Sequence, residues 1–471
     1  MKRSKIVLYN PKAVFYTMPL ALIAIGSQLD PRKYEVKIID GRLEKDPAKT
    51  VLAEIDDALC LGITVLTGNP IRDALRISRA AKSQRSDLPV IWGGWHPSLF
   101  PTKTLEDEAS IDITVQGQGE ETFRELIGHL TEQNDLSAVK GISYCSKGEV
   151  IQNPPRSLMD MNELQAANYD LIQTEDYFKL KGKRQLDYIS STGCYFRCAF
   201  CADPFVYDRK WTGLQPERMG AELEYLKKNY EFDDIDFQDE TFFTYRKRAL
   251  GIAGQFIQRS IESTWAGTMR ADQGSRLSEE DLALCAKSGL RRLLIGVESG
   301  SQKMLDWMKK DIKIGQILEN AERCRRHGIA VIFPFIVGFP GESDEFVWET
   351  LDMVKKLRAM SPDFDTPIFY YKPYPGSKIT RDVVKNGYSL PDTLDEWTNF
   401  DYIGSSGPWV SKKKYKMIER FKFYSRIAGG HQKWFYMPLH KLAGWRCNND
   451  FYKLPIEKII IERLKPLPKL S

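Results

Sequence analysis

The chain has 471 residues, of which 42% are hydrophobic and 28% are charged, as in an ordinary globular protein of two or three domains. Only three of the eight cysteines lie close together, and no apolar run reaches about 18 residues. These features exclude a disulfide framework and a membrane-spanning helix. With no signal peptide at the start, we expect a reducing cytoplasm.

Strand-like apolar runs alternate with helical segments over residues 1–140. The runs lie at residues 5–11, 36–40, 58–66, 89–94 and 111–117. This alternation predicts a Rossmann-like, doubly wound parallel sheet in an α/β fold, and such sheets bind ligands at the carboxyl ends of their strands. The small or polar residues at these ends, together with the first residue of the following helix, are Asn10, Thr64, Thr67, Gly93, Gly94, Gly117, Gly119 and Glu120. Glycines there let a ligand approach the backbone, and the free N–H groups of a helix starting near Glu120 suit an anionic group.

Residues 141–184 are predicted to form a linker that starts with a hairpin-like piece and passes through two prolines. The next domain is expected at residues 185–385. A basic, aromatic and mostly helical extension is expected at residues 386–471.

Three cysteines, Cys194, Cys198 and Cys201, follow a β-branched apolar run with the spacing C-x3-C-x2-C. Three thiolates on so short a loop can hold one iron–sulfur cluster. A [4Fe–4S] cluster with three protein ligands keeps one iron open for an outside ligand, which implies chemistry at the cluster. A zinc site is disfavoured because it needs four ligands, commonly in C-x2-C pairs, and no second pair occurs here.

The cysteine motif, with the aromatic Phe200 directly before its third cysteine, resembles the signature of the radical S-adenosylmethionine (SAM) enzymes. Residues 62–69, 90–101 and 115–123 resemble the cobalamin-binding domain of the B12-binding radical SAM family, including the anaerobic Mg-protoporphyrin ester cyclase type. The chain departs from that pattern at Gln118, where an acidic residue is usual. It also lacks the D-x-H-x-x-G motif of proteins that bind cobalt through histidine. We therefore expect His96 to be structural or to contact the cobalamin tail rather than to bind cobalt.

The resemblance implies a six-stranded partial (β/α)6 TIM-like barrel, with strands at residues 234–240, 263–272, 291–300, 329–342 and 366–376 after the strand before the cysteines. It also implies how SAM is bound at the carboxyl ends of these strands. Asp239 and Glu240 would accept hydrogen bonds from the SAM amino group, and Arg270 would bind its carboxylate. Glu298 would contact the ribose or the amino acid end. The strand carrying Gly338 would pack on the adenine, with Phe200 stacked nearby.

The resemblance further implies reductive cleavage of SAM at the [4Fe–4S] cluster, followed by attack of a 5′-deoxyadenosyl radical on an unactivated C–H bond. With cobalamin bound, C-methylation of a small-molecule or lipid-like substrate is favoured. A cyclase or oxidative rearrangement enzyme is the alternative, and a cobalamin or iron–sulfur sensor is the non-enzyme alternative. The electron donor would be of the ferredoxin or flavodoxin type, and we expect no nucleic acid partner.

The C-terminal stretch concentrates the positive charge. Residues 411–471 carry 15 Lys/Arg and 4 Asp/Glu, whereas the preceding residues carry 53 and 59. Its aromatic residues are Trp434, Phe435, Tyr436, Trp445, Phe451 and Tyr452. The favoured interpretation is a set of helices that cap the barrel with a solvated basic face, and the alternative is a peripheral membrane contact.

Overall fold

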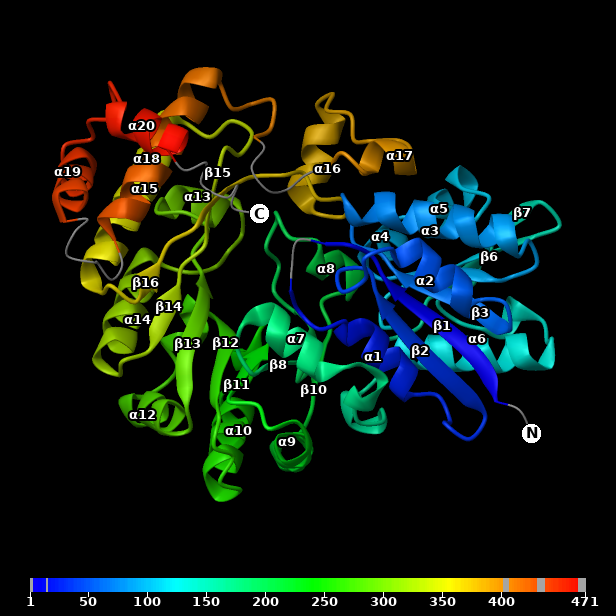
Figure 1. Cartoon of the computed structure of the whole chain (residues 1–471). Helices are drawn as coiled ribbons and strands as arrows, with labels where there is room; N and C mark the ends of the chain where they lie inside the picture. The colour runs from blue at the N-terminus through cyan, green and yellow to red at the C-terminus, as the bar shows by residue number, and fades with distance from the viewer. Residues whose placement is uncertain (1–2, 14–15, 401–405, 430–436, 465–471) are drawn as a thin grey trace. The chain divides into compact units, whose positions relative to one another are not determined.

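The computed structural model describes residues 3–13, 16–400, 406–429 and 437–464 (Figure 1). The chain divides into two compact units. The first unit contains Met1–Tyr195, Ala202–Asp234 and Val384–Asp401, and the second contains Phe196–Cys201, Ile235–Val383 and Tyr402–Ser471.

A seven-stranded sheet organises the first unit, in the order β2-β1-β3-β4-β5-β6-β7. Its strands are β1 (Ser4–Asn10), β2 (Tyr34–Asp40), β3 (Ala58–Thr64), β4 (Val90–Gly93), β5 (Ile113–Val115), β6 (Ile142–Ser146) and β7 (Glu149–Gln152). The first five are parallel, as predicted. Four consecutive residues of β1, from Ile6 to Tyr9, are fully buried, which is the pattern of a parallel strand covered on both faces.

Helices that follow the strands cover this sheet (Figure 1). The helices of the first unit are α1 (Leu20–Ser27), α2 (Pro47–Glu54), α3 (Pro70–Gln84), α4 (Trp95–Leu99), α5 (Pro101–Asp107), α6 (Glu120–Glu132), α7 (Thr174–Lys181), α8 (Asp203–Val206), α9 (Pro216–Tyr230) and α17 (Leu394–Trp397). Short 3-10 turns occur at Leu136–Ala138, Met161–Glu163 and Tyr169–Leu171. In α6, Phe123, Leu126 and Ile127 pack into the same core as Ile6 and Leu8 of β1.

Two predicted boundaries differ from the structure. The first part of the predicted 141–184 linker forms β6 and β7, an antiparallel hairpin that extends the sheet through the pairing of Thr114 with Ser143. The predicted extension 386–471 also does not stay together. Its first part, with α17, belongs to the first unit, where Arg72 donates to Asn399 at 2.9 Å and Arg79 forms an ion pair with Asp395.

A six-stranded sheet in the order β16-β14-β13-β12-β11-β8 forms the strands of the predicted barrel. They are β8 (Gln185–Tyr188), β11 (Asp234–Phe237), β12 (Thr264–Arg270), β13 (Leu290–Gly296), β14 (Ala330–Ile332) and β16 (Phe364–Asp365). Two short strands before and after the cysteine loop, β9 (Ser191–Gly193) and β10 (Trp211–Gly213), pair with each other. The expected α/β repeat of six strands is confirmed.

Prolines divide each of the last two predicted strands in two. Pro334 separates β14 from β15 (Phe335–Val337), and Pro367 separates β16 from β17 (Ile368–Tyr370). Proline has no N–H to donate, so the regular ladder breaks at both positions. The neighbours bridge the break, because Phe335 donates its N–H to the carbonyl of Pro367 at 2.8 Å. As a result, β15 and β17 form a separate two-stranded sheet.

The helices of the second unit are α10 (Arg246–Gln258), α11 (Ala271–Gly274), α12 (Glu279–Lys287), α13 (Gln302–Trp307), α14 (Ile314–Arg326), α15 (Asp344–Met360), α16 (Lys378–Lys385), α18 (Lys412–Ala428), α19 (Met437–Asn448) and α20 (Ile456–Leu464), with a 3-10 turn at Phe242–Thr244. The C-terminal extension is helical, as expected. Tyr415 of α18 stacks on Tyr370 of β17 at 5.2 Å between ring centroids, so α18 packs on the end of this strand. Within the described residues, no helix is long and apolar enough to span a bilayer.

Candidate active site

The cysteine loop starts at a position that only glycine can occupy. Gly193, the last residue of β9, has φ +91°, and a Cβ there would collide with the carbonyl oxygen of Lys210 next to β10. This close approach of the two strands turns the chain sharply. Cys194 therefore leaves β9 in a fixed direction.

The rest of the loop is fastened to the second unit by backbone hydrogen bonds. The N–H of Ala199 donates to the carbonyl of Met308 at 2.8 Å, and the carbonyl of Ala199 accepts from Ile379 at 2.9 Å. Ala199 is buried, whereas Cys198 and Cys201 on either side are half-buried. The loop thus keeps its backbone anchored and its thiols accessible.

The three clustered thiols fit an iron–sulfur cluster by their chemistry and exposure. All three are half-buried, whereas Cys60, Cys285, Cys324 and Cys447 are buried in cores. Among the described residues, no three His, Cys, Asp or Glu side chains are close enough to bind one metal ion. A [4Fe–4S] cluster binds each thiolate through a different iron, so its ligands stand farther apart than those of one ion. Thiolates are the ligands that such clusters use.

Arg270, at the end of β12, supports the cysteine loop. Its guanidinium donates from Nη1 to Sγ of Cys198 at 3.4 Å, from Nε to Asp272 at 2.9 Å, and from Nη2 to the carbonyl of Lys310. The guanidinium carbon also lies 3.7 Å from the ring centroid of Phe196. These contacts use three of the five guanidinium N–H groups, so Arg270 helps to hold Cys198, and its contact with the SAM carboxylate stays a prediction.

Lys310 was not singled out by any sequence pattern, yet it contacts three predicted residues. Its Nζ lies 2.9 Å from Oε1 of Glu298, its carbonyl accepts from Arg270, and its ammonium lies 5.8 Å from the ring centroid of Phe200. Burial alone would lower the pKa of Lys310, but Glu298 and the sulfur of Cys198 outweigh this effect and raise it. The ammonium is therefore charged at neutral pH and compensates Glu298.

The predicted SAM contacts do lie at successive strand ends. Asp239 and Glu240 follow β11, and the hydroxyl of Thr268 in β12 donates to the carbonyl of Asp239 at 2.8 Å. Glu298 follows β13 in a left-handed conformation with φ +65°. Gly338 follows β15. The order along the chain agrees with the predicted arrangement.

Glu342 is a second buried group that the sequence did not distinguish. Its Oε2 accepts the N–H groups of Gly338 at 2.5 Å and Phe339 at 3.3 Å, and its Oε1 is buried without a hydrogen-bond partner. Burial raises the pKa of Glu342 to about 7, against the opposing effects of those N–H groups and of Lys414. Lys414 of α18 donates to the backbone carbonyl of Glu342 at 2.9 Å, so α18 fastens this loop.

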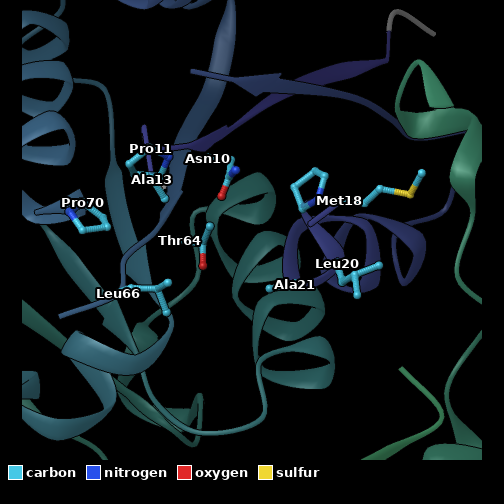
Figure 2. A pocket seen from close by; sticks show the side chains of 10 residues that line it. Asn10, Pro11, Ala13, Met18, Leu20, Ala21, Thr64, Leu66 and Pro70 are labelled. Carbon is cyan, nitrogen blue, oxygen red and sulfur yellow. The ribbon is translucent and has the colours of Figure 1, made fainter. Parts of the chain in front are cut away.

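The cobalamin residues predicted in the first unit gather at one edge of its sheet. A cavity of about 160 Å³ opens there, between the ends of β1 and β3 (Figure 2). It is lined mainly by apolar side chains and by Asn10 and Thr64, which Figure 2 shows near each other. Pockets that enclose whole drug-sized ligands have volumes of about 300 Å³ or more. This cavity can therefore take only one part of a cobalamin.

Glycines shape the neighbouring strand ends. A Cβ on Gly94 (φ +93°) would lie 3.0 Å from both Oγ1 of Thr64 and the backbone nitrogen of Val65, so the turn after β4 is closed tightly on β3. By contrast, nothing lies within 4 Å of a Cβ on Gly117 (φ +68°), and this residue is exposed. The backbone at Gly117 is open to a ligand. Gly93 and Gly119 stand beside these two turns, and this edge fits a group that approaches the backbone closely.

His96 is enclosed and does not face that edge. Its ring is 1% exposed, lies between Phe100 and Trp397 at centroid distances of 5.3 and 5.7 Å, and is 3.4 Å from the hydroxyl of Thr67. Burial lowers the pKa of His96 to about 3, so the ring is neutral. These contacts favour the structural role of the two expected for His96. Thr67 is a neighbour of His96, and its contact with cobalamin stays a prediction.

The helix that follows β5 begins at Glu120, as expected. Burial raises the pKa of Glu120. Gln118, the departure from the family pattern, accepts the backbone N–H of Met159 at 2.7 Å through Oε1. It therefore holds the chain that leaves the hairpin, a role that an amide fills as well as a carboxylate.

Comparisons with known proteins agree with this arrangement. The model of the B12 binding domain matches residues 6–127, and that of the Radical SAM superfamily matches residues 188–354. An uncharacterized methyltransferase of Pyrococcus horikoshii is 30% identical over 442 residues, which are 90% of this chain and 94% of the relative. The anaerobic magnesium-protoporphyrin IX monomethyl ester cyclase of Synechocystis sp. is 24% identical over 350 residues, 73% of this chain and 69% of the relative.

Among solved structures, the cobalamin-dependent S-adenosylmethionine radical enzyme OxsB, with aqua-cobalamin and S-adenosylmethionine bound, has the same fold. The TM-score is 0.74 at 20% identity, over 98% of this chain and 75% of OxsB. The two matched domains, the near full-length relative and the cysteine loop agree with one another. The chain belongs to the radical SAM enzymes that carry a B12-binding domain, with SAM, a [4Fe–4S] cluster and cobalamin as cofactors.

Proposed function

We propose that this enzyme methylates an unactivated carbon of a small-molecule or lipid-like substrate. The observation that carries this proposal is the presence, in one chain, of a fastened three-cysteine loop and of an open strand edge in the B12-binding domain. The near full-length relative is named a methyltransferase, which favours methylation over cyclisation. When bound, the cluster and cobalamin supply radical generation and methyl transfer, chemistry that side chains do not perform.

The residues of the chain would position these groups. Cys194, Cys198 and Cys201 would bind the cluster, and Arg270 would hold Cys198 through the 3.4 Å contact to its sulfur. Asp239 and Glu240 would accept hydrogen bonds from the SAM ammonium group at the end of β11.

The remaining SAM contacts would come from the neighbouring strands. Gly338 would present the backbone of its strand to the adenine, beside Phe200. Glu298, held by Lys310, would keep a carboxylate near the ribose or the amino acid end of SAM. Each of these roles follows from the position of the residue at a strand end.

The cobalamin would lie along the carboxyl edge of the first sheet. Asn10 and Thr64 would contact it from the cavity walls, and Gly93, Gly94, Gly117 and Gly119 would let it approach the backbone. Glu120, at the start of α6, would contact a polar group of the cofactor. We assign His96 to the packing behind this edge, and Thr67 beside it stays a predicted cobalamin contact.

A cyclase or oxidative rearrangement enzyme is the second candidate, because the Synechocystis cyclase matches 73% of this chain. Both candidates need an external reductant, for which we propose a ferredoxin or flavodoxin. The two candidate activities form different products from SAM. Methyl donation converts SAM to S-adenosylhomocysteine, whereas radical generation converts it to methionine and 5′-deoxyadenosine.

The test uses protein purified without oxygen, with its cluster rebuilt and cobalamin bound, and supplied with SAM carrying a deuterated methyl group. Iron and corrin are counted per chain, and both SAM products are measured in the presence of a reductant. Formation of both products, with corrin near one per chain, supports the methyltransferase. 5′-Deoxyadenosine alone supports the cyclase type, and a full cluster without corrin contradicts the cobalamin site. A cobalamin or iron–sulfur sensor would bind the cofactors and form neither product.

A further inference from the structure

The two C-terminal helices expose an unusual concentration of large apolar side chains. Eight of the twenty exposed large hydrophobic residues in the described parts of the chain lie between Met437 and Ile460. They are Met437, Leu442, Trp445, Phe451, Leu454, Ile456, Ile459 and Ile460, and we call them the α19–α20 surface. Leu454 is 72% exposed and Ile456 is 60% exposed. Concentrations of this kind mark interaction sites.

Hydrogen bonds within the second unit hold the helices of this surface in place. Arg446 of α19 is buried and donates from Nε to Glu457 of α20 at 2.7 Å, and its two Nη atoms donate to the carbonyls of Lys453 and Leu454 at 2.9 and 3.0 Å. Tyr424 of α18 donates to the same Glu457 at 3.1 Å. One guanidinium therefore fixes α19, the turn and α20 to one another. The exposed Leu454 sits on a turn whose backbone is held in place.

Ion pairs engage Glu457 and Asp450, the two acidic side chains that are described in this segment. Glu457 pairs with Arg446, and Asp450 pairs with Lys355 of α15 at 3.0 Å. The side chains of Lys441 and Lys453 are exposed between the apolar residues. Both carboxylates described in this segment are thus neutralised by buried or half-buried partners, and exposed lysines set the charge of the surface.

We propose that the α19–α20 surface docks on the face of an anionic lipid bilayer. Helices that lie in the plane of a bilayer combine Lys with Trp, Phe and Leu in this manner, and Trp and Tyr are enriched at the level of the lipid headgroups. Trp445 and Phe451, with ring centroids 5.7 Å apart, provide this aromatic pair. A protein interface is the less suitable occupant, because lysine is depleted there. The inference rests on the proposed function in one respect: docking would give the enzyme access to a lipid-like substrate.

The test measures co-sedimentation of the full-length protein with vesicles of phosphatidylcholine alone or mixed with phosphatidylglycerol. We expect binding to the mixed vesicles that weakens as salt is raised, and much weaker binding to the neutral ones. Leu454→Glu and Ile456→Glu should each lower the partition coefficient roughly tenfold, since a charge replaces an inserted apolar group. Lys441→Glu should remove most of the preference for anionic lipid. The matched control is Ile257→Glu on α10, 39% exposed and far along the chain, which should bind as the unmodified protein does.

Several outcomes would overturn the proposal. One is the absence of binding to either vesicle, and another is equal binding to both. A third is binding that Leu454→Glu and Ile257→Glu weaken equally. Self-association that Leu454→Glu abolishes, without vesicle binding, would assign the surface to a second copy of the chain. Thermal unfolding and iron content of each variant check that it is folded. Formation of 5′-deoxyadenosine is measured separately, so failure of the proposed activity and failure of docking are distinguishable.

Discussion

The ammonium nitrogen of Lys310 lies 2.9 Å from the carboxylate of Glu298, and both side chains are buried at the ends of barrel strands. The carbonyl of the same lysine accepts a hydrogen bond from Arg270, which also contacts Cys198. One residue thereby connects the end of β13, the end of β12 and the cysteine loop. The pair therefore places a positive and a negative charge side by side at the strand ends, where SAM would bind.

Removing the lysine should be more damaging than removing the pair. Lys310→Met leaves Glu298 charged and buried, and we expect it to cost about 3–5 kcal/mol in the free energy of unfolding. The double variant Lys310→Met/Glu298→Gln removes both charges and should recover a large part of that loss. Urea unfolding of the cofactor-free protein measures both values. A cost under about 1 kcal/mol for Lys310→Met would mean that the pair is solvated.

Single replacements in the cysteine loop should abolish the cluster. Cys194→Ser, Cys198→Ser and Cys201→Ser each remove one of three thiolates, so we expect iron after reconstitution to fall to a small fraction and 5′-deoxyadenosine to disappear. Cys145→Ser is the matched control, because Cys145 is an exposed free thiol in β6. It should keep the full iron content. Normal iron in any of the three loop variants would exclude that cysteine as a ligand.

The buried carboxyl of Glu342 should make stability depend on pH. Its pKa is raised to about 7 in the folded protein and is close to 4.5 when unfolded, so the folded state binds the extra proton between these values. This contribution is fully present at low pH and is lost as pH rises through about 7. Above that pH the penalty is about 3–4 kcal/mol, since each tenfold difference in proton affinity between the two states is worth about 1.4 kcal/mol.

Glu342→Gln should remove this dependence, because the amide oxygen still accepts the N–H groups of Gly338 and Phe339. Urea unfolding at pH 5 and pH 8 should show the variant gaining stability over the unmodified protein only at the higher pH. The neutral, buried His96 stabilises in the opposite sense, with a contribution that is lost as pH falls below about 6.5. It is common to both proteins, so it cancels in their difference. A difference that does not change between the two pH values would contradict a raised pKa.

A methyl group at Gly338 should loosen the contact between β15 and the segment before α18. A Cβ there would lie 2.6 Å from Cγ2 of Val410, and φ is +78°. We expect Gly338→Ala to cost about 2–4 kcal/mol from overpacking and left-handed strain. Adding Val410→Ala opens the space and should recover the overpacking part, leaving about 1–2 kcal/mol of strain. If the double variant were no more stable than Gly338→Ala, the contact with Val410 would not limit this position.

Spacing and periodicity along the chain predicted an iron–sulfur loop and the order of the elements. Short-range spacing placed Cys194, Cys198 and Cys201 on one loop, and the alternation of apolar runs predicted both α/β domains, because each strand must bury a continuous apolar face. The radical chemistry and the expected roles of Asp239 and Gly338 followed from the family resemblance. Such features are local along the chain, so they can be read without knowing which segments meet.

Folding in three dimensions determined which side chains face one another. Lys310 carries no motif, and it contacts Glu298 and Arg270 because the segment between α13 and α14 lies against the strand ends. Arg270 contacts Asp272, Cys198 and the carbonyl of Lys310, and no pattern in the sequence predicted these contacts. The hairpin β6–β7 joined the sheet through long-range pairing, and Trp397 came from a distant part of the chain to cover His96. Each of these contacts joins segments that are far apart in sequence, and no periodicity in the sequence encodes them.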